Sequence, residues 1–197
     1  MKKIMFNDNY GLTFAVKIRY KWKTRRICRE QQWSFSDLIN ANENKHFIFE
    51  RPKYQIGEVV AVAQSYNDIL KECDYIKYYG RYKFGDELLT KDELKGGWNN
   101  KMFVRADLMP LRIRITDIKV ERLQDISDED CMAEGVRNIL DCNNLYGVIK
   151  YHKSGEITFL TGKTPREVYS TLIDKISGRG TWQRNPFVFA YDFELIK

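Results

Sequence analysis

Alternating apolar and polar side chains predict three β-strands, each with one face in a core. At the end of the chain, in residues 187–195, aromatic residues and a leucine occupy every second position. In residues 111–120 leucine and isoleucine alternate with arginine, until the apolar phase slips at Thr116 and Asp117. We expect one long strand with a bulge there, or two strands that meet at a bend. A third strand is predicted in residues 56–62, after a turn at its Gly-Glu pair.

Two helices are predicted from their capping residues. Ser127 precedes three acidic residues, as an N-cap does, and the helix that it begins would present an apolar side made of Met132, Val136 and Ile139. Thr164 and Glu167 form a capping box with proline at the first helical position. This second helix is expected to end at Gly178.

The order of these elements predicts a mixed α+β domain in which strands dominate. At 197 residues the chain has the length of one domain, so we expect residues 1–197 to form a single domain. Residues 66–100 and 140–163 do not continue the pattern and are interpreted as insertions. A small mixed β-barrel with flanking helices fits this arrangement better than an alternating βαβ fold.

Composition narrows the class of protein. With 43% hydrophobic residues the chain can bury a core, which excludes a disordered chain. No apolar run reaches the ~18 residues of a membrane helix, and the first residues do not form a signal peptide. We expect a cytoplasmic protein without a membrane partner. The cysteines and histidines are too widely spaced for a zinc site, so no metal and no cofactor is expected; they are Cys28, Cys73, Cys131, Cys142, His46 and His152.

The positive charge is concentrated in one stretch. The chain has a formal charge of +6, yet residues 17–29 alone hold seven cations and no acid, so the remainder is close to neutral. Tyr20 and Trp22 lie between these cations. Cations with interleaved aromatic rings suit an RNA or a nucleotide, because phosphates attract charge and bases stack on flat rings. A solvated strand or helix face that only confers solubility is the alternative, and composition does not decide between them.

Common catalytic motifs are missing from the sequence. Gly162, Lys163 and Thr164 precede a helix as the end of a P-loop does, but a P-loop needs a further glycine where Ile157 stands. The chain also has no GxSxG nucleophile motif and no HExxH metal motif. Gly162, Lys163 and Thr164 are therefore interpreted as the cap of a helix and not as a phosphate-binding loop.

Four segments in this order together resemble an ASCH domain, of the PUA-like superfamily, and in particular its larger phage- and mobile-element-type members. The segments are KWKTRRI at 21–27, YQIGEVVAV at 54–62, IRITDIKVERLQDI at 113–126 with AEG at 133–135, and WQRNPFVF at 182–189. The resemblance implies a small β-barrel with flanking helices that binds RNA in a cleft. The residues expected to contact RNA or a nucleotide are Lys21, Trp22, Lys23, Arg25, Arg26 and Arg29.

The resemblance also implies a possible enzyme. Some small ASCH proteins are amidohydrolases that remove the acetyl group from the exocyclic amine of acetylated cytidine. Their lysine, threonine and glutamate correspond to Lys21, Thr24 and Glu134 here. In that chemistry Thr24 is the nucleophile, Lys21 is a base whose pKa is lowered by cations or burial, and Glu134 protonates the leaving amine.

Three functions therefore remain open. The first is binding of RNA or a nucleotide around residues 21–26 with Glu134 on the wall of the cleft; the second is the amidohydrolase; the third is a non-catalytic interaction module of a mobile element. Arg19 and Trp22 replace a glycine and a threonine of the family pattern, so Trp22 either stacks a base or fills the pocket. Alternatively, Glu134 has a structural role, in which it forms an ion pair with Arg25 or Arg26.

Overall fold

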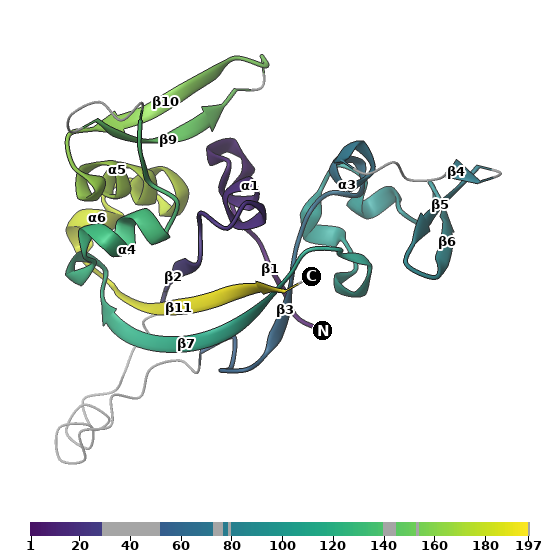
Figure 1. Cartoon of the computed structure of the whole chain (residues 1–197), viewed down its shortest axis with the longest axis horizontal. Coiled ribbons are helices and arrows are strands. Elements are labelled where there is room, and N and C mark those ends of the chain that lie inside the picture. Colours follow the sequence, from purple (N-terminus) through teal and green to yellow (C-terminus); the bar gives the residue numbers. More distant parts are fainter. Residues whose placement is uncertain (29–51, 73–76, 79, 140–144, 153, 197) are drawn as a thin grey trace.

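A curved five-stranded sheet forms the centre of the computed structural model, which describes residues 1–28, 52–72, 77–78, 80–139, 145–152 and 154–196 (Figure 1). In spatial order its strands are β1 (Lys3–Ile4), β3 (Val59–Val62), β7 (Arg112–Arg122), β11 (Phe187–Ile196) and β2 (Lys23–Ile27). Neighbouring strands are antiparallel except β1 and β3, which are parallel. The strand β2 that bears the basic stretch is therefore an edge strand.

The predicted bulge lies in the pairing of the two long strands. Asp192 of β11 faces Asp117 of β7, whereas the next residue, Phe193, faces Ile115. Thr116 is thus the extra residue, at the position where the apolar phase slips in the sequence. The predictions of one long strand with a bulge and of the last strand are confirmed. The third strand, predicted in residues 56–62, is confirmed for residues 59–62, and residues 56 and 57 form a turn.

Of the two predicted helices, one has the expected bounds and the other is shorter. Helix α5 (Pro165–Ser177) starts at Thr164, whose hydroxyl accepts a hydrogen bond from the Glu167 amide, and it ends at Gly178. Helix α4 (Asp128–Ala133) is capped by Ser127 as expected, but it stops before Gly135, where φ is 110°. The predicted apolar side of this helix is wrong: Met132 is exposed, and Val136 and Ile139 lie beyond its end.

The helices α4, α5 and α6 (Thr181–Arg184) lie between the central sheet and a second, three-stranded sheet (Figure 1). The strands of the second sheet are β8 (Arg137–Asn138), β9 (Tyr146–Tyr151) and β10 (Ile157–Gly162). Most of the predicted insertion 140–163 is thus a β-hairpin. Helix α1 (Leu12–Lys17) and the 3-10 turn η1 (Asp8–Tyr10) close the same side of the central sheet. One continuous hydrophobic core joins these elements.

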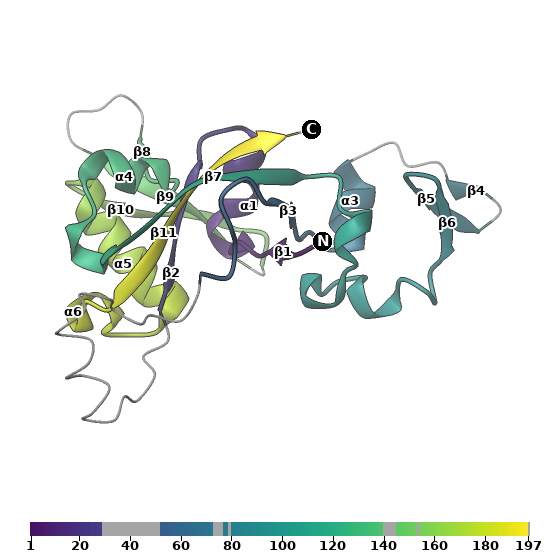
Figure 2. The same cartoon turned by 90° about the horizontal axis from the view of Figure 1, so that it is seen from below.

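The other predicted insertion builds a separate lobe at the side of the central sheet (Figure 2). It contains helix α3 (Tyr66–Glu72) and the antiparallel strands β4 (Lys77–Tyr78), β5 (Arg81–Phe84) and β6 (Glu87–Thr90). Short 3-10 turns lead back to β7; they are η2 (Lys95–Gly97), η3 (Lys101–Phe103) and η4 (Ala106–Leu108). A second apolar cluster around Tyr66, Ile69 and Phe84 fills this lobe. The prediction of a single domain stays a prediction, and both insertions contain regular secondary structure.

The chain belongs to the α+β class. Among the strands that the structure describes, β1 and β2 are left as the two edges of the central sheet, and no pairing closes it into a barrel. The strand pairing therefore does not confirm the predicted barrel. Within the same described residues, no helix is both long enough and apolar enough to span a membrane.

Candidate functional site

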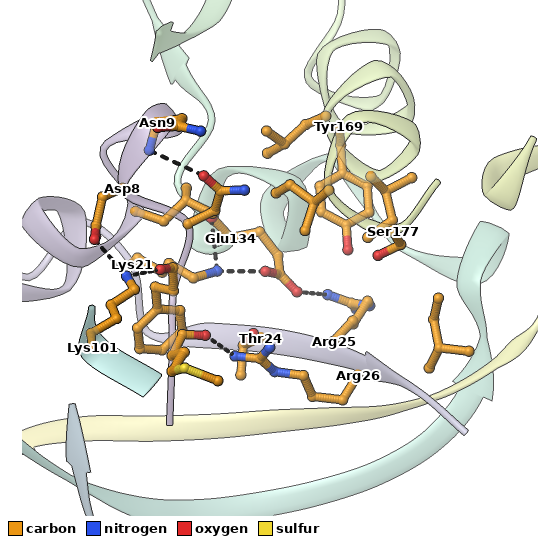
Figure 3. Close-up of a pocket in the computed structure, with 18 residues that line it drawn as sticks. Asp8, Asn9, Lys21, Thr24, Arg25, Arg26, Lys101, Glu134, Tyr169 and Ser177 are labelled. Carbon is orange, nitrogen blue, oxygen red and sulfur yellow. Dashed lines mark hydrogen bonds and ion pairs between the residues drawn. The ribbon is translucent and has the colours of Figure 1, made fainter. Parts of the chain in front are cut away.

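A cavity of about 640 Å³ opens beside the edge strand β2 (Figure 3). Its walls come from the segment before α1, from β2, from the end of α4 and from one face of α5. The residues that line it are Met5, Phe6, Asn7, Asp8, Asn9, Leu12, Lys21, Thr24, Arg25, Arg26, Ile27, Lys101, Glu134, Tyr169, Leu172, Ile173, Ile176 and Ser177. The cavity thus holds Lys21, Thr24 and Glu134, the three residues that the resemblance singles out.

Lys21 precedes β2 by two residues, and its buried side chain lies beside the free edge of that strand. Two hydrogen bonds at the ends of β2 show which of its residues pair with β11. The Cys28 N–H donates to the Phe187 carbonyl, and the Phe193 N–H donates to the Trp22 carbonyl. The even-numbered residues of β2 therefore form the hydrogen bonds to β11. The carbonyl of Lys23 therefore points away from β11, toward the edge. Lys21 Nζ donates to this carbonyl at 2.7 Å, and to the backbone carbonyl and Oε2 of Glu134 at 2.9 and 2.5 Å. Three acceptors engage all three protons of the ammonium group.

Burial sets the protonation balance of this ion pair. The side chain of Lys21 is only 1% exposed, and desolvation lowers its pKa below the ordinary lysine value. Glu134 raises the pKa but does not cancel this effect, and the charges of Arg26 and Arg25 lower it further. Lys21 is therefore an ammonium that loses its proton more readily than a surface lysine does.

Arg25 is held by three carboxylates on the inner side of β2. Its Nη2 lies 2.6 Å from Glu121 Oε1 and 2.6 Å from Asp130 Oδ2, and its Nη1 lies 3.4 Å from Glu134 Oε1. Glu134 consequently bridges Lys21 and Arg25. The structural alternative for Glu134, an ion pair with Arg25, is thus present together with the contact to Lys21. With its side chain 1% exposed, Arg25 has no free face for a phosphate.

Lys23 is neutralised in a similar way, on the side of the strand that faces α4. Its Nζ lies 3.1 Å from Asp130 Oδ1 and 3.0 Å from Asp192 Oδ2, and its side chain is 26% exposed. Acids from α4, β7 and β11 and Glu134 thus pair with Lys21, Lys23 and Arg25, three of the seven cations that the sequence groups together. The positive charge of these three side chains is balanced inside the fold.

The remaining predicted contact residues have different positions. Trp22 is 46% exposed and does not line the cavity, so it does not fill the pocket. Tyr20 is also exposed, with the guanidinium of Arg137 3.8 Å from the centre of its ring. Arg29 lies outside the described residues. The predicted roles of these side chains in nucleic-acid binding stay predictions.

Thr24 and Arg26 share the other face of β2, because alternate residues of a strand point the same way. Thr24 is 4% exposed and lines the cavity, and no described residue forms a hydrogen bond with its hydroxyl. Lys21 does not donate to this hydroxyl, since its three protons go to other acceptors. A role of Lys21 as base for Thr24 would require the ammonium to give up a proton and one of these bonds.

Tyr169 is a cavity residue that no sequence motif indicates. It projects from α5 toward the Glu134–Arg25 pair (Figure 3) and is 2% exposed. Burial, followed by the charge of Glu134, raises the pKa of its hydroxyl well above the usual value. In the sequence Tyr169 belongs to the apolar stripe of α5, where an aromatic residue ordinarily indicates core packing. Lys101, which pairs with Asp8 at 2.6 Å, was also not predicted.

In the described part of the chain, no three His, Cys, Asp or Glu side chains lie together in a way that could hold a metal ion. The side chains of the cavity instead provide the hydroxyls of Thr24, Tyr169 and Ser177, the buried Lys21–Glu134 ion pair and further charged groups. Such a set can bind a polar heterocycle and, through Thr24, can form a covalent bond to a carbonyl carbon.

Comparison of the chain with protein-family models, with curated proteins and with solved structures finds no match in any of the three. The resemblance to ASCH domains therefore rests on the four sequence segments alone.

Proposed function

We propose that this chain is a nucleotide-binding protein of the ASCH type, which takes one nucleoside or nucleotide unit into the cavity beside β2. The observation that carries the proposal is the buried Lys21–Glu134 ion pair on the wall of a cavity of about 640 Å³. Cavities of a few hundred Å³ hold small ligands. The exocyclic amine of a base donates hydrogen bonds, and the Glu134 carboxylate, which Lys21 and Arg25 hold in place, keeps acceptor lone pairs that can receive one.

The buried charges of the cavity favour a ligand that inserts one nucleotide over an RNA whose phosphate backbone runs along β2. Lys21 and Arg25 are fully engaged with buried carboxylates, so neither is available to a row of phosphates. An RNA ligand would place a single unstacked nucleotide in the cavity and use exposed side chains such as Trp22 outside it. The curved pair β7–β11 with α4 and α5 packed against it supports the finer proposal of a PUA-like fold.

Calorimetric titration of the purified protein with cytidine, uridine, adenosine and their 5′-monophosphates tests the binding proposal. We expect one of these ligands to bind, and Glu134→Gln to weaken its binding at least about tenfold, because a charged hydrogen bond is lost. Glu156→Gln is the matched control, since Glu156 is exposed on the far hairpin. The proposal would be overturned if Glu134→Gln bound the ligand as tightly as the wild-type protein, or if folded wild-type protein bound none of these ligands. The non-catalytic interaction module would then remain as the function to test.

An amidohydrolase acting on acetylated cytidine is the second candidate, and the position of Thr24 favours it. Its hydroxyl lines the same cavity and is engaged by no described residue. The 2.5 Å contact lets the proton pass from Lys21 Nζ to Glu134 Oε2, which makes Lys21 neutral. Thr24 Oγ then bonds to the acetyl carbon while its proton moves to Lys21. The C–N bond breaks, the amine takes the proton of Glu134, and water hydrolyses the acetyl-threonine to acetate.

Release of acetate from acetylated cytidine tests this reaction directly. We expect turnover by the wild-type protein and none by Thr24→Val, which keeps the size of the side chain but removes the nucleophile. Thr24→Val should still bind cytidine, because the ion pair is intact. Turnover by Thr24→Val, or no turnover by wild-type protein that binds cytidine, would remove the reaction and retain the binding function.

A further inference from the structure

Arg26 differs from the other cations of the cavity. Lys21 and Arg25 contact Glu134, and Lys101 contacts Asp8. Among the described residues, by contrast, no carboxylate pairs with Arg26. Its Nη2 donates to the carbonyl of Met5 at 2.7 Å, while its Nε is buried and donates to no described residue. Arg26 thus carries uncompensated charge and an unused buried donor, a combination that proteins seldom retain without a role.

The guanidinium of Arg26 is held in place at the cavity wall. The Met5 carbonyl fixes one end of the group, and the ring of Phe6 lies 5.6 Å from its Cζ. The same ring lies 5.5 Å from Lys21 Nζ, so Phe6 connects the ion pair with the unpaired arginine. A positioned guanidinium loses little freedom when it binds an anion.

Arg26 also lies far enough from Thr24 for one ligand to contact both residues with different parts. Thr24 and Arg26 are two residues apart on one strand face, which separates their Cα atoms by about 7 Å. A ligand that meets Thr24 and the ion pair with one part therefore has room to meet Arg26 with another. The part that meets Arg26 would be an anion, because a guanidinium offers donors and no acceptor.

We propose that Arg26 binds the phosphate of the ligand, so that the cavity takes nucleoside monophosphates in preference to nucleosides. This inference rests on the proposed function, since it identifies the class of ligand for the same cavity. The guanidinium presents its donors as a planar fork that fits two phosphate oxygens. The base and its exocyclic amine lie at the Lys21–Glu134 pair, and the phosphate lies at the Arg26 end of the cavity.

The test compares cytidine, its 5′- and 3′-monophosphates and inorganic phosphate by calorimetric titration of wild-type protein and variants. We expect one monophosphate to bind at least about tenfold more tightly than cytidine, and inorganic phosphate to bind weakly. Arg26→Met should remove this preference, because it takes away the guanidinium that meets the phosphate. Arg179→Met deletes the same charge from an exposed position outside the cavity and should keep the preference.

The outcomes separate the inference from the function on which it rests. Equal affinity of wild-type protein for cytidine and both monophosphates, or a preference that persists in Arg26→Met, overturns the role of Arg26 and leaves nucleoside binding in place. Failure of every nucleoside and nucleotide to bind overturns the proposed function itself. Arg26→Lys keeps the charge without the fork, so it should retain only part of the preference, and it serves as the test if Arg26→Met does not fold.

Discussion

Lys21 Nζ and Glu134 Oε2 lie 2.5 Å apart across a separation of 113 residues, and both side chains are almost fully buried. The backbone around them enforces the contact. The amide of Trp22 donates to the carbonyl of Ala133 at 3.1 Å, which ties the start of β2 to the end of α4. The ion pair is therefore part of the junction between the central sheet and the helical layer.

A double-mutant cycle on this pair should reveal strong coupling. Lys21→Met leaves the Glu134 carboxylate buried with only Arg25 nearby, and we expect a loss of about 3–5 kcal/mol in the free energy of unfolding. In the combined variant Lys21→Met, Glu134→Gln the unpaired charge is absent, so the loss should be smaller than the sum of the two single losses. Urea denaturation measures the free energy of unfolding of the two single variants and of the combined variant. Simple additivity would contradict an interaction between the two side chains.

The lowered pKa of Lys21 has a measurable signature. In protein labelled with ¹³C-lysine, the Cε resonance of Lys21 should titrate below its ordinary pKa of 10.5, because burial disfavours the ammonium. Lys21→Arg assigns the resonance, and the exposed lysines of the same sample provide the reference. A Lys21 resonance that titrates at or above 10.5 would contradict the desolvation argument.

The sign of the corresponding effect on stability follows from proton linkage. Between the lowered pKa of folded Lys21 and 10.5, the unfolded chain binds a proton that the folded chain has released. The contribution of Lys21 to stability therefore rises with pH across this window. The difference in stability between wild type and Lys21→Met isolates this contribution from that of other groups.

The elements that the sequence predicts correctly are those with local signals. The alternation of β11, the phase slip at Thr116 and the capping residues of α5 all lie within the elements that they define. The end of α4 was missed, although its signal, Gly135, is present in the sequence; in the structure this glycine has a φ of 110°. There the apolar residues Val136 and Ile139 suggested that the helix continues.

The candidate site shows where sequence patterns stop being informative. The cations of β2 form one run in the sequence, but their partners Glu121 and Asp130 lie 96 and 105 residues from Arg25. Pairing over such distances depends on the register of strands and on helix docking, neither of which charge patterning encodes. Tyr169 was missed for a related reason, because its apolar neighbours on α5 gave it the appearance of a core residue.

The paired glycines of η2 should respond very differently to alanine. A Cβ at Gly97 would lie 2.5 Å from Cε2 of Tyr66 and 2.9 Å from Cγ1 of Val104, both inside the second apolar cluster. We expect Gly97→Ala to lower the free energy of unfolding by about 1–3 kcal/mol through overpacking. Gly96→Ala is the adjacent control, since its Cβ would meet only Phe103 Cβ at 3.6 Å. Equal stability of the two variants in thermal denaturation would contradict this packing.

Cys131 should be chemically inert while the protein is folded. The thiol is fully buried in α4, and desolvation, followed by the charge of Asp128, raises its pKa to about 12. Because the thiolate is the reactive form, iodoacetamide at pH 8 should leave Cys131 unmodified in the native protein and modify it in urea. Peptide mass spectrometry resolves it from the other cysteines. The unfolded thiol ionises near 9.0, so its contribution to stability is full below that pH and is lost as the pH rises toward 12. Rapid native alkylation of Cys131 would show that α4 opens readily, and the Lys21–Glu134 contact at its end would open with it.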